Sequence, residues 1–384
     1  MALKVGSRGN IPAFIVMEVM RAAAEREAEG EAAYHLEVGQ PGTSAPKGVI
    51  EAAHHALDGE RIGYTVALGI PPLRTAIARH YTDWYGVDLS VDRVVATTGS
   101  SAGFLLGFLA AFDPGDRVAL AAPGYPCYRH ILTALGIEPV LLETTAADRF
   151  QPTPALLDQA MADGPIHGLI VASPSNPTGT MLDRTALTGL VRYCEGHDIR
   201  LVSDEIYHGI SYGHETVSVA ELTNRALIIN SFSKYFSMTG WRLGWMVVPE
   251  DLHRPVECLA QNLFISPPTL SQFAAVAAFE CHDELRANVK GYAANRARLI
   301  ASLPKIGFPD FSPSDGAFYI YADIAHRTND SVDFCRRMLS ETGVAATPGL
   351  DFDHARGNRF MRISFAGSHA DIDGAIKALD GWRG

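Results

Sequence analysis

Cysteine is scarce in this chain, and its spacing excludes two kinds of site. The five cysteines lie at positions 127, 194, 258, 281 and 335, which is an odd number without a Cys-x-x-Cys pair. This spacing fits neither a disulfide framework nor a zinc site. We therefore expect free thiols in a reducing compartment and no metal site.

An excess of basic residues is also missing, and so is a long apolar run. The chain has 32 Lys and Arg against 43 Asp and Glu, a net charge of −11, which argues against nucleic-acid partners. The most apolar stretch, Ala102 to Phe112, is too short to span a bilayer. The start, Met1 to Asn10, lacks a secretory apolar core. These absences predict a cytoplasmic protein that binds neither nucleic acid nor membrane.

The composition that remains is that of a large globular protein. Hydrophobic residues make up 47% of the 384 positions and charged residues 20%, which fits a large core. The length is enough for two ordinary domains or for one large domain with a satellite. No Gly-x-Gly-x-x-Gly follows a candidate strand, which argues against a pure nucleotide-binding α/β protein.

Short apolar segments alternate with helical ones from about residue 93. Each apolar segment lacks clean alternation, as expected of strands that are covered on both faces. The expected strands are 93–98, 117–121, 139–143, 168–172, 199–203, 226–230 and 244–248. This order predicts the α/β class, with a three-layer large domain built on a mostly parallel seven-stranded sheet.

The pattern changes after Pro267-Pro268. Residues 270–303 are typical of a long helix broken near Cys281, and they precede a strand at 316–321, a helix at 331–342 and a strand at 359–365. We expect a large domain over 45–270. A smaller α+β domain is expected from 1–44, with a helix at 15–29, together with 271–384.

Chemically suggestive residues follow the expected strands, where ligands bind in open α/β sheets. Lys234 lies in the segment SFSKYFSMTGWRLGW, from Ser231 to Trp245, and Arg242 comes eight residues later. A lysine amine can form a Schiff base with an aldehyde cofactor, and an arginine can bind a phosphate through two hydrogen bonds. A lone lysine after a strand is more often a solvated surface charge.

The other candidates are each ambiguous when taken alone. Gly99-Ser100-Ser101-Ala102 precedes a helix and fits an anion site or an ordinary N-cap. Asp204 fits a partner for a cationic ring nitrogen, an N-cap or a salt bridge. Tyr125, Asn176 and Tyr207 fit ligand contacts, or else packing and turn formation. Arg362, within an apolar strand, needs an anion if it is buried, either a substrate carboxylate or an internal acid.

Together these residues resemble a fold-type I enzyme that depends on pyridoxal 5′-phosphate (PLP), of the class I/II aminotransferase family. The resemblance runs in order from Val38-Gly39-Gln40-Pro41 to Arg362. Its most specific motifs are Ser-x-Ser-Lys-x(7)-Arg, from Ser231 to Arg242, and Ser-Asn-Pro-Thr-Gly around Asn176.

The resemblance implies a role for each residue. Lys234 would hold PLP through a Schiff base and then move a proton between the substrate α-carbon and the cofactor. Asp204 would pair with the pyridinium nitrogen, and Arg362, with the backbone at Gly39, would bind the substrate α-carboxylate. The remaining cofactor contacts would be phosphate contacts from Arg242, Ser231, Ser100, Ser101 and Ala102, O3′ contacts from Asn176 and Tyr207, and ring stacking by Tyr125. Tyr64 would reach the phosphate of a neighbouring subunit, which implies a homodimer with shared active sites.

The implied activity is transfer of an α-amino group to a 2-oxo acid, with 2-oxoglutarate as the expected acceptor. A basic residue for an acidic side chain is missing around residues 261–266, and the segment from Ile11 to Ile15 is apolar. Neutral aliphatic or aromatic amino acids are therefore the expected donors. A C–S or β-lyase of the same fold would use Lys234, Asp204 and Arg362 equally well. A non-catalytic PLP-binding effector module is a remote alternative, because no basic helix-turn-helix segment precedes the large domain.

Overall fold

A seven-stranded sheet forms the centre of the structure, a computed structural model that describes residues 3–383. Its strand order is β2-β8-β7-β6-β5-β3-β4. The strands are β2 (Val94–Thr97), β3 (Arg117–Ala122), β4 (Glu138–Glu143), β5 (Gly168–Ala172), β6 (Arg200–Asp204), β7 (Leu227–Ser231) and β8 (Gly244–Val247). Strand β8 is antiparallel to its neighbours β2 and β7, and the other pairs are parallel. The mostly parallel sheet of the sequence prediction is confirmed.

Helices cover both faces of this sheet. Along β7, Leu227 and Ile229 join one apolar cluster, whereas Ile228 between them joins the other, because alternate side chains of a strand point to opposite faces. Helices α4 (Gly99–Ala111), α5 (Pro126–Leu135) and α8 (Glu250–Leu263) contribute to the cluster on the Leu227 face. Helices α3 (Pro71–Tyr85) and α7 (Arg184–Gly196) contribute to the cluster on the Ile228 face. The three-layer arrangement explains why these strands carry no polar face.

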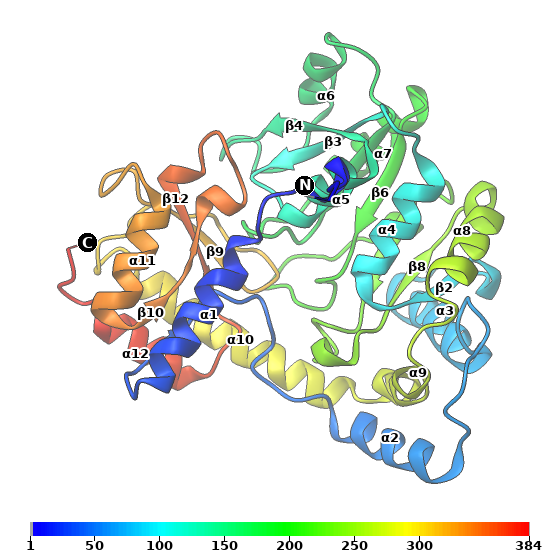
Figure 1. Ribbon diagram of the computed structural model, residues 1–384, viewed down its shortest axis with the longest axis horizontal. Helices are drawn as coiled ribbons and strands as arrows, with labels where there is room; N and C mark the ends of the chain where they lie inside the picture. The colour runs from blue at the N-terminus through cyan, green and yellow to red at the C-terminus, as the bar shows by residue number, and fades with distance from the viewer. Residues whose placement is uncertain (1–2, 384) are drawn as a thin grey trace.

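A second, smaller group of elements packs beside the large sheet (Figure 1). Strands β11 (Thr347–Pro348), β12 (Phe360–Ser364) and β9 (Tyr319–Asp323) form an antiparallel sheet in that order. Strand β1 (Tyr34–His35) pairs in parallel with β10 (Val344–Ala345). The surrounding helices are α1 (Ile15–Ala28), α10 (His282–Ser302), α11 (Ser331–Thr342) and α12 (His369–Leu379). Helix α1 packs against β10 and β11, so an N-terminal helix joins the C-terminal part of the chain here.

The expected long helix after residue 270 is interrupted at Cys281, as the sequence indicates. Helix α9 (Thr269–Val276) is followed by a 3₁₀ segment, Ala277–Glu280, and α10 begins at His282. Helix α9 packs on α2 (Lys47–Gly59) and on α3, and α3 also contacts strand β2 of the large sheet. The domain limits at 45 and 270 stay a prediction, and residues 1, 2 and 384 of the expected small domain lie outside the described residues.

Three structural features concern membrane spans, metal-binding clusters and paired cysteines. Among residues 3–383, no helix combines the length and the apolar character that crossing a bilayer requires. In the same part of the chain, no three His, Cys, Asp or Glu side chains are placed to hold a metal ion together. All five cysteines are free thiols.

The remaining α-helix of the described residues, α6 (Pro154–Met161), packs on α7 and β4.

Candidate active site

Lys234 lies in the loop after β7 and points into a pocket at the carboxyl-terminal edge of the parallel strands. Its Nζ donates a hydrogen bond of 2.6 Å to the carbonyl oxygen of Gly39. Burial, together with the nearby positive charges of Arg362 and Arg242, lowers the pKa of Lys234 from its ordinary 10.5 to about 8. About one in ten of these amines is therefore neutral at pH 7, and the neutral amine is the form that attacks a carbonyl or accepts a proton.

Asp204, the last residue of β6, lines the same pocket and is 4% exposed. The Tyr128 hydroxyl donates to its Oδ2, and the backbone N–H of Ile206 donates to Oδ1 at 3.0 Å. Burial raises the pKa of Asp204 to about 6, although these two donors and Lys234 favour the charged form. A cation placed against this carboxylate would ionise it fully. Sequence reasoning did not find Tyr128, which lies one helical turn after Tyr125.

The amino-terminal end of α4 and Arg242 form the cationic end of the pocket. Ser100 and Ser101 line the pocket there together with Arg242. Gly99 and the Arg242 guanidinium lie close together, because a Cβ added to Gly99, whose φ is +72°, would lie 2.5 Å from Arg242 Nη2. The free N–H groups of a helix start, hydroxyls and a guanidinium together suit a phosphate.

Three of the predicted ring contacts also line the pocket. Tyr207 is 5% exposed, and its hydroxyl lies 2.7 Å from the hydroxyl of Tyr319. Asn176, which is 7% exposed, accepts a hydrogen bond of 2.9 Å from Arg362 Nη1. Tyr125 packs edge-on against Phe14, with ring centroids 6.0 Å apart. The pocket thus collects residues from the ends of β2, β3, β5, β6 and β7, as the position of ligands in open α/β sheets predicts.

Arg362, on β12, is 2% exposed yet forms no ion pair with a carboxylate of residues 3–383. Its guanidinium donates to Asn176, to the Glu37 carbonyl oxygen and to Thr347 Oγ1 at 3.1 Å. Its Nε is buried and has no hydrogen-bond partner among the described residues. A buried cation in this state calls for an anion from outside the chain.

The rest of the pocket wall is largely apolar. It includes Phe14, Val16, Met17, Cys127 and Ile131. Only Phe14 falls in the segment that the sequence singles out for this role. The carboxylate of Asp351 holds the start of α1 in place, since its oxygens accept from the N–H groups of Ile15 at 3.2 Å and Val16 at 3.4 Å.

Three predicted site residues do not line the pocket. Ala102 is buried within the first turn of α4. Ser231 is 1% exposed, and its hydroxyl donates to the Leu243 carbonyl oxygen at 3.3 Å and accepts from the Ser233 N–H at 3.0 Å. Tyr64 is 85% exposed on the loop between α2 and α3. Their predicted roles stay predictions.

The arrangement fits PLP on chemical grounds. A nucleophilic amine lines the same pocket as a cationic end that suits a phosphate and a buried carboxylate that suits a ring nitrogen, the features that PLP requires. Arg362 adds a site for a carboxylate beside the lysine. The residues present can therefore hold an aldehyde cofactor, bind an amino acid by its carboxylate and move a proton.

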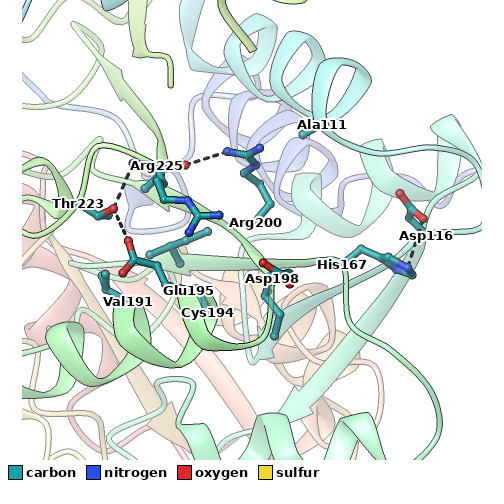
Figure 2. Close-up of a pocket in the computed structure, with 13 residues that line it drawn as sticks. Ala111, Asp116, His167, Val191, Cys194, Glu195, Asp198, Arg200, Thr223 and Arg225 are labelled. Atoms are coloured by element: carbon teal, nitrogen blue, oxygen red, sulfur yellow. Dashed lines mark hydrogen bonds and ion pairs between the residues drawn. The ribbon is translucent and has the colours of Figure 1, made fainter. Parts of the chain in front are cut away.

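A cavity of about 320 Å³ at the opposite edge of the sheet does not offer comparable chemistry (Figure 2). It lies where β3, β5, β6 and β7 begin. Its charged groups largely bind one another or the backbone: Asp116 with His167 at 3.6 Å, and Arg200 with the Arg225 carbonyl oxygen at 2.9 Å. The pocket around Lys234, of about 200 Å³, is smaller but contains the reactive groups.

Comparison with known proteins points to the same chemistry. Residues 33–379 match the family model described as aminotransferase class I and II. The chain is 51% identical over 383 residues to the valine–pyruvate aminotransferase of Mycobacterium tuberculosis, covering 99% of this chain and 98% of that protein. It is 32% identical to the aspartate aminotransferase of Thermotoga maritima, over 96% of both chains.

A solved structure agrees over the full length. The crystal structure of an aminotransferase from Mycobacterium tuberculosis superimposes with a TM-score of 0.97 at 49% sequence identity. The match covers 100% of this chain and 99% of that one. The fold therefore agrees with that of a solved aminotransferase.

Proposed function

We propose that this chain, which belongs to the aminotransferase class I and II family, transfers the α-amino group of a neutral aliphatic amino acid to a short 2-oxo acid. The family assignment makes the chain a PLP-dependent aminotransferase of fold type I. Beyond this assignment, we propose the identity of the two substrates and the role of each residue.

The observation that carries the proposal is the buried Arg362 without an acidic partner. An α-carboxylate placed in the pocket beside this guanidinium would neutralise its charge through charge-assisted hydrogen bonds. The backbone at Gly39 borders the same space. Every amino acid and 2-oxo acid carries this carboxylate, so Arg362 serves both halves of a transamination.

Lys234 and Asp204 would carry the proton chemistry. When bound, PLP withdraws electrons from the α-carbon of the amino acid. The neutral amine of Lys234 would accept the proton released at that carbon and would carry it to the cofactor. Positioned acid–base help of this kind contributes about 10²–10⁴-fold in rate. Asp204 keeps the ring nitrogen protonated, since its buried carboxylate is stabilised by a cation beside it.

The remaining predicted residues would hold the cofactor in register with Lys234. Arg242, Ser100 and Ser101 would bind its phosphate, with Ala102 contributing its N–H and Ser231 supporting the loop. Tyr207 and Asn176 would donate to the ring oxygen O3′, and Tyr125 would lie against the ring. The position of all but Ala102 and Ser231 in the pocket lining supports these roles.

The apolar wall formed by Phe14, Val16 and Met17 supports an aliphatic side chain on the donor. The M. tuberculosis relative is named for valine and pyruvate, which agrees with this wall. Pyruvate fits the same space because its methyl group is small and apolar. The acceptor 2-oxoglutarate, expected from the family resemblance, would instead bring a second carboxylate that needs a cation. 2-Oxoglutarate is therefore the alternative acceptor to be compared with pyruvate.

A homodimer with shared active sites would place Tyr64 in the neighbouring subunit's pocket. Tyr64 is exposed, and so are Ile62 and Val66 beside it. Leu263 and Ile265 lie on an adjoining segment that hydrogen-bonds to Thr65 through Ser266. An apolar surface of this kind is typical of a subunit interface. Free thiols at all five cysteines support a cytoplasmic location.

A half-reaction screen tests the substrate assignment. Purified holoenzyme is mixed with one amino acid at a time, without any oxo acid, and the absorption of the bound cofactor reports conversion to the amine form. We expect valine and other aliphatic amino acids to react faster than aspartate. The converted enzyme is then mixed with pyruvate or 2-oxoglutarate, and pyruvate should restore the original spectrum faster. A strong preference for aspartate, or for 2-oxoglutarate, would refute the corresponding assignment.

Subunit mixing tests the shared site. Tyr64→Ala and Lys234→Ala chains each lack one component, but a hybrid dimer contains one site with both wild-type residues. Mixing the two inactive or weakened variants under exchange conditions should restore activity. Light scattering should give a mass about twice the chain mass of 41.4 kDa. Restored activity would be inconsistent with a site built from a single chain.

A further inference from the structure

Tyr319, the first residue of β9, links the cofactor side of the pocket to the substrate side. It is 1% exposed and lines the pocket. Its hydroxyl lies 2.7 Å from the Tyr207 hydroxyl, and its ring centroid lies 4.5 Å from the guanidinium carbon of Arg362. One side chain thus contacts both the tyrosine assigned to the cofactor and the arginine assigned to the substrate.

The number of available protons decides whether Tyr207 or Tyr319 donates the hydrogen bond between their hydroxyls. Burial raises the pKa of both tyrosines, so each hydroxyl keeps its proton near neutral pH. One of the two protons lies in the hydrogen bond between them. If Tyr319 donates it, Tyr207 keeps its own proton to donate to a second acceptor. If Tyr207 donates it, Tyr207 has none left for the cofactor. A negatively charged oxygen beside Tyr207 therefore favours donation from Tyr319.

The backbone fixes the position of the Tyr319 hydroxyl. A Cβ added at Gly39 would lie 1.7 Å from the hydroxyl oxygen and 2.7 Å from the ring carbon Cζ that bears it. Gly39 is thus required because the tyrosine occupies the space of a side chain there. The carbonyl of the same glycine accepts from Lys234 Nζ. The hydroxyl is therefore held against the segment that positions the lysine.

The ring of Tyr319 also holds Arg362. Tyr319 contacts the guanidinium, and Phe352 lies 4.8 Å from the same carbon. Contacts between a cation and an aromatic ring are worth more when they are desolvated, as at this 2% exposed arginine. The two rings constrain the orientation of the guanidinium whose Nε is unpaired.

We propose that Tyr319 is a positioning residue for both the cofactor and the substrate carboxylate. Its hydroxyl donates to Tyr207 and directs the Tyr207 proton toward the cofactor oxygen O3′, and its ring aligns Arg362 for the α-carboxylate. This inference rests on the proposed roles of Tyr207 and Arg362. It adds a residue that lies among apolar neighbours in sequence and outside the predicted motifs.

The hydroxyl is tested by spectroscopy of the holoenzyme rather than by turnover. The absorption of the bound cofactor is followed across the pH range in which the protein stays folded, and its midpoint is compared among Tyr319→Phe, Tyr207→Phe and the double variant. A hydrogen-bond donor to O3′ stabilises the deprotonated form of the bound cofactor. Tyr207→Phe removes that donor and should therefore raise the pH midpoint of the absorption change. Tyr319→Phe should raise it by a few tenths of a pH unit, and by nothing in the Tyr207→Phe background. Tyr321→Phe is the matched control, because that buried hydroxyl on the same strand has no partner among the described residues.

Any other outcome of this titration contradicts either the role of the Tyr319 hydroxyl or the role of Tyr207. An unchanged midpoint in Tyr319→Phe, or an equal shift in both backgrounds, overturns the role of the hydroxyl while leaving Tyr207 in place. An unchanged midpoint in Tyr207→Phe overturns the proposed role of Tyr207 and the inference with it.

The ring is tested by binding of 3-methylbutanoate, which has the carboxylate and side chain of valine but no amino group. Its dissociation constant is measured on holoenzyme by spectral titration. Tyr319→Phe keeps the ring and should bind about as tightly as wild type, whereas Tyr319→Leu should bind roughly threefold to thirtyfold more weakly. Equal binding by Tyr319→Leu overturns the role of the ring. Thermal unfolding and bound-cofactor content confirm that each variant is folded and loaded.

Discussion

The pKa of Lys234 can be raised or lowered by replacing a charged neighbour. Arg362 lowers the pKa of this lysine and Asp204 raises it, while burial has the largest effect. Replacing Arg362 with Gln removes a positive charge, so the pKa should rise above its value of about 8 in the apoenzyme. Replacing Asp204 with Asn removes the stabilising negative charge, so the pKa should fall below that value.

The expected effect on reactivity is large. At pH 7 an amine with a pKa of about 8 is neutral roughly one time in ten, against roughly one in three thousand at the ordinary value of 10.5. A single nearby charge at an intermediate dielectric contributes on the order of 1–2 kcal/mol. Arg362→Gln should therefore reduce the neutral fraction of Lys234 at pH 7 by about tenfold.

Amine labelling of the apoenzyme measures this fraction directly. A small acylating reagent is applied as brief pulses at a series of pH values, and mass spectrometry quantifies the peptide that contains Lys234. Arg359→Gln is the matched control, since it removes the same charge from an exposed arginine that pairs with Asp323. Midpoints that move the same way in both variants of the site, or an equal shift in the Arg359 control, would refute the electrostatic account.

Three further outcomes are expected. Lys234→Ala should fold normally but show neither the absorption of covalently bound cofactor nor transamination; retained activity would remove Lys234 from its role. Asp351→Ala should loosen the start of α1 at a cost of about 0.5–2 kcal/mol, and kinetics should show a higher KM for valine with cofactor binding little changed. The pKa of His35 is raised from 6.5 to about 9 by hydrogen bonds to Glu37 and Glu27, so its stabilising effect is complete below pH 6.5 and lost as the pH rises through about 9. Denaturant unfolding should therefore show a deficit of on the order of 1–2 kcal/mol for His35→Gln near pH 6 that disappears above about pH 9.

The sequence predicts the residues that follow the strands of the large sheet, and the reason is geometric. Parallel strands end at one edge, so Asp204 after β6 and Lys234 after β7 must lie close together once both strands are identified. The strands themselves are recognisable because they are apolar throughout. The predicted strand at 199–203 differs from β6 by one residue at each end, which leaves the position of Asp204 unchanged.

The residues that sequence reasoning missed act through contacts between distant segments. Tyr319 lies among apolar residues and resembles a core tyrosine until β9 is placed beside Tyr207. Asp351 caps α1 across 336 positions of sequence, and no local motif reports such a contact. Tyr128 had the one local signal, since it follows Tyr125 by three residues at the start of α5.

Cofactor binding and substrate choice therefore depend on different parts of the chain. The proposed cofactor contacts follow strands of one sheet, whereas the proposed substrate contacts come from the start of α1, from the segment at Gly39 and from β12. A motif around Lys234 can identify the cofactor because a single sheet fixes its geometry. The same motif cannot identify the amino acid, because Phe14, Val16 and Met17 owe their position to Asp351 rather than to the sheet. Substitutions at this wall should redistribute kcat/KM among amino acids while the spectrum of the bound cofactor stays the same.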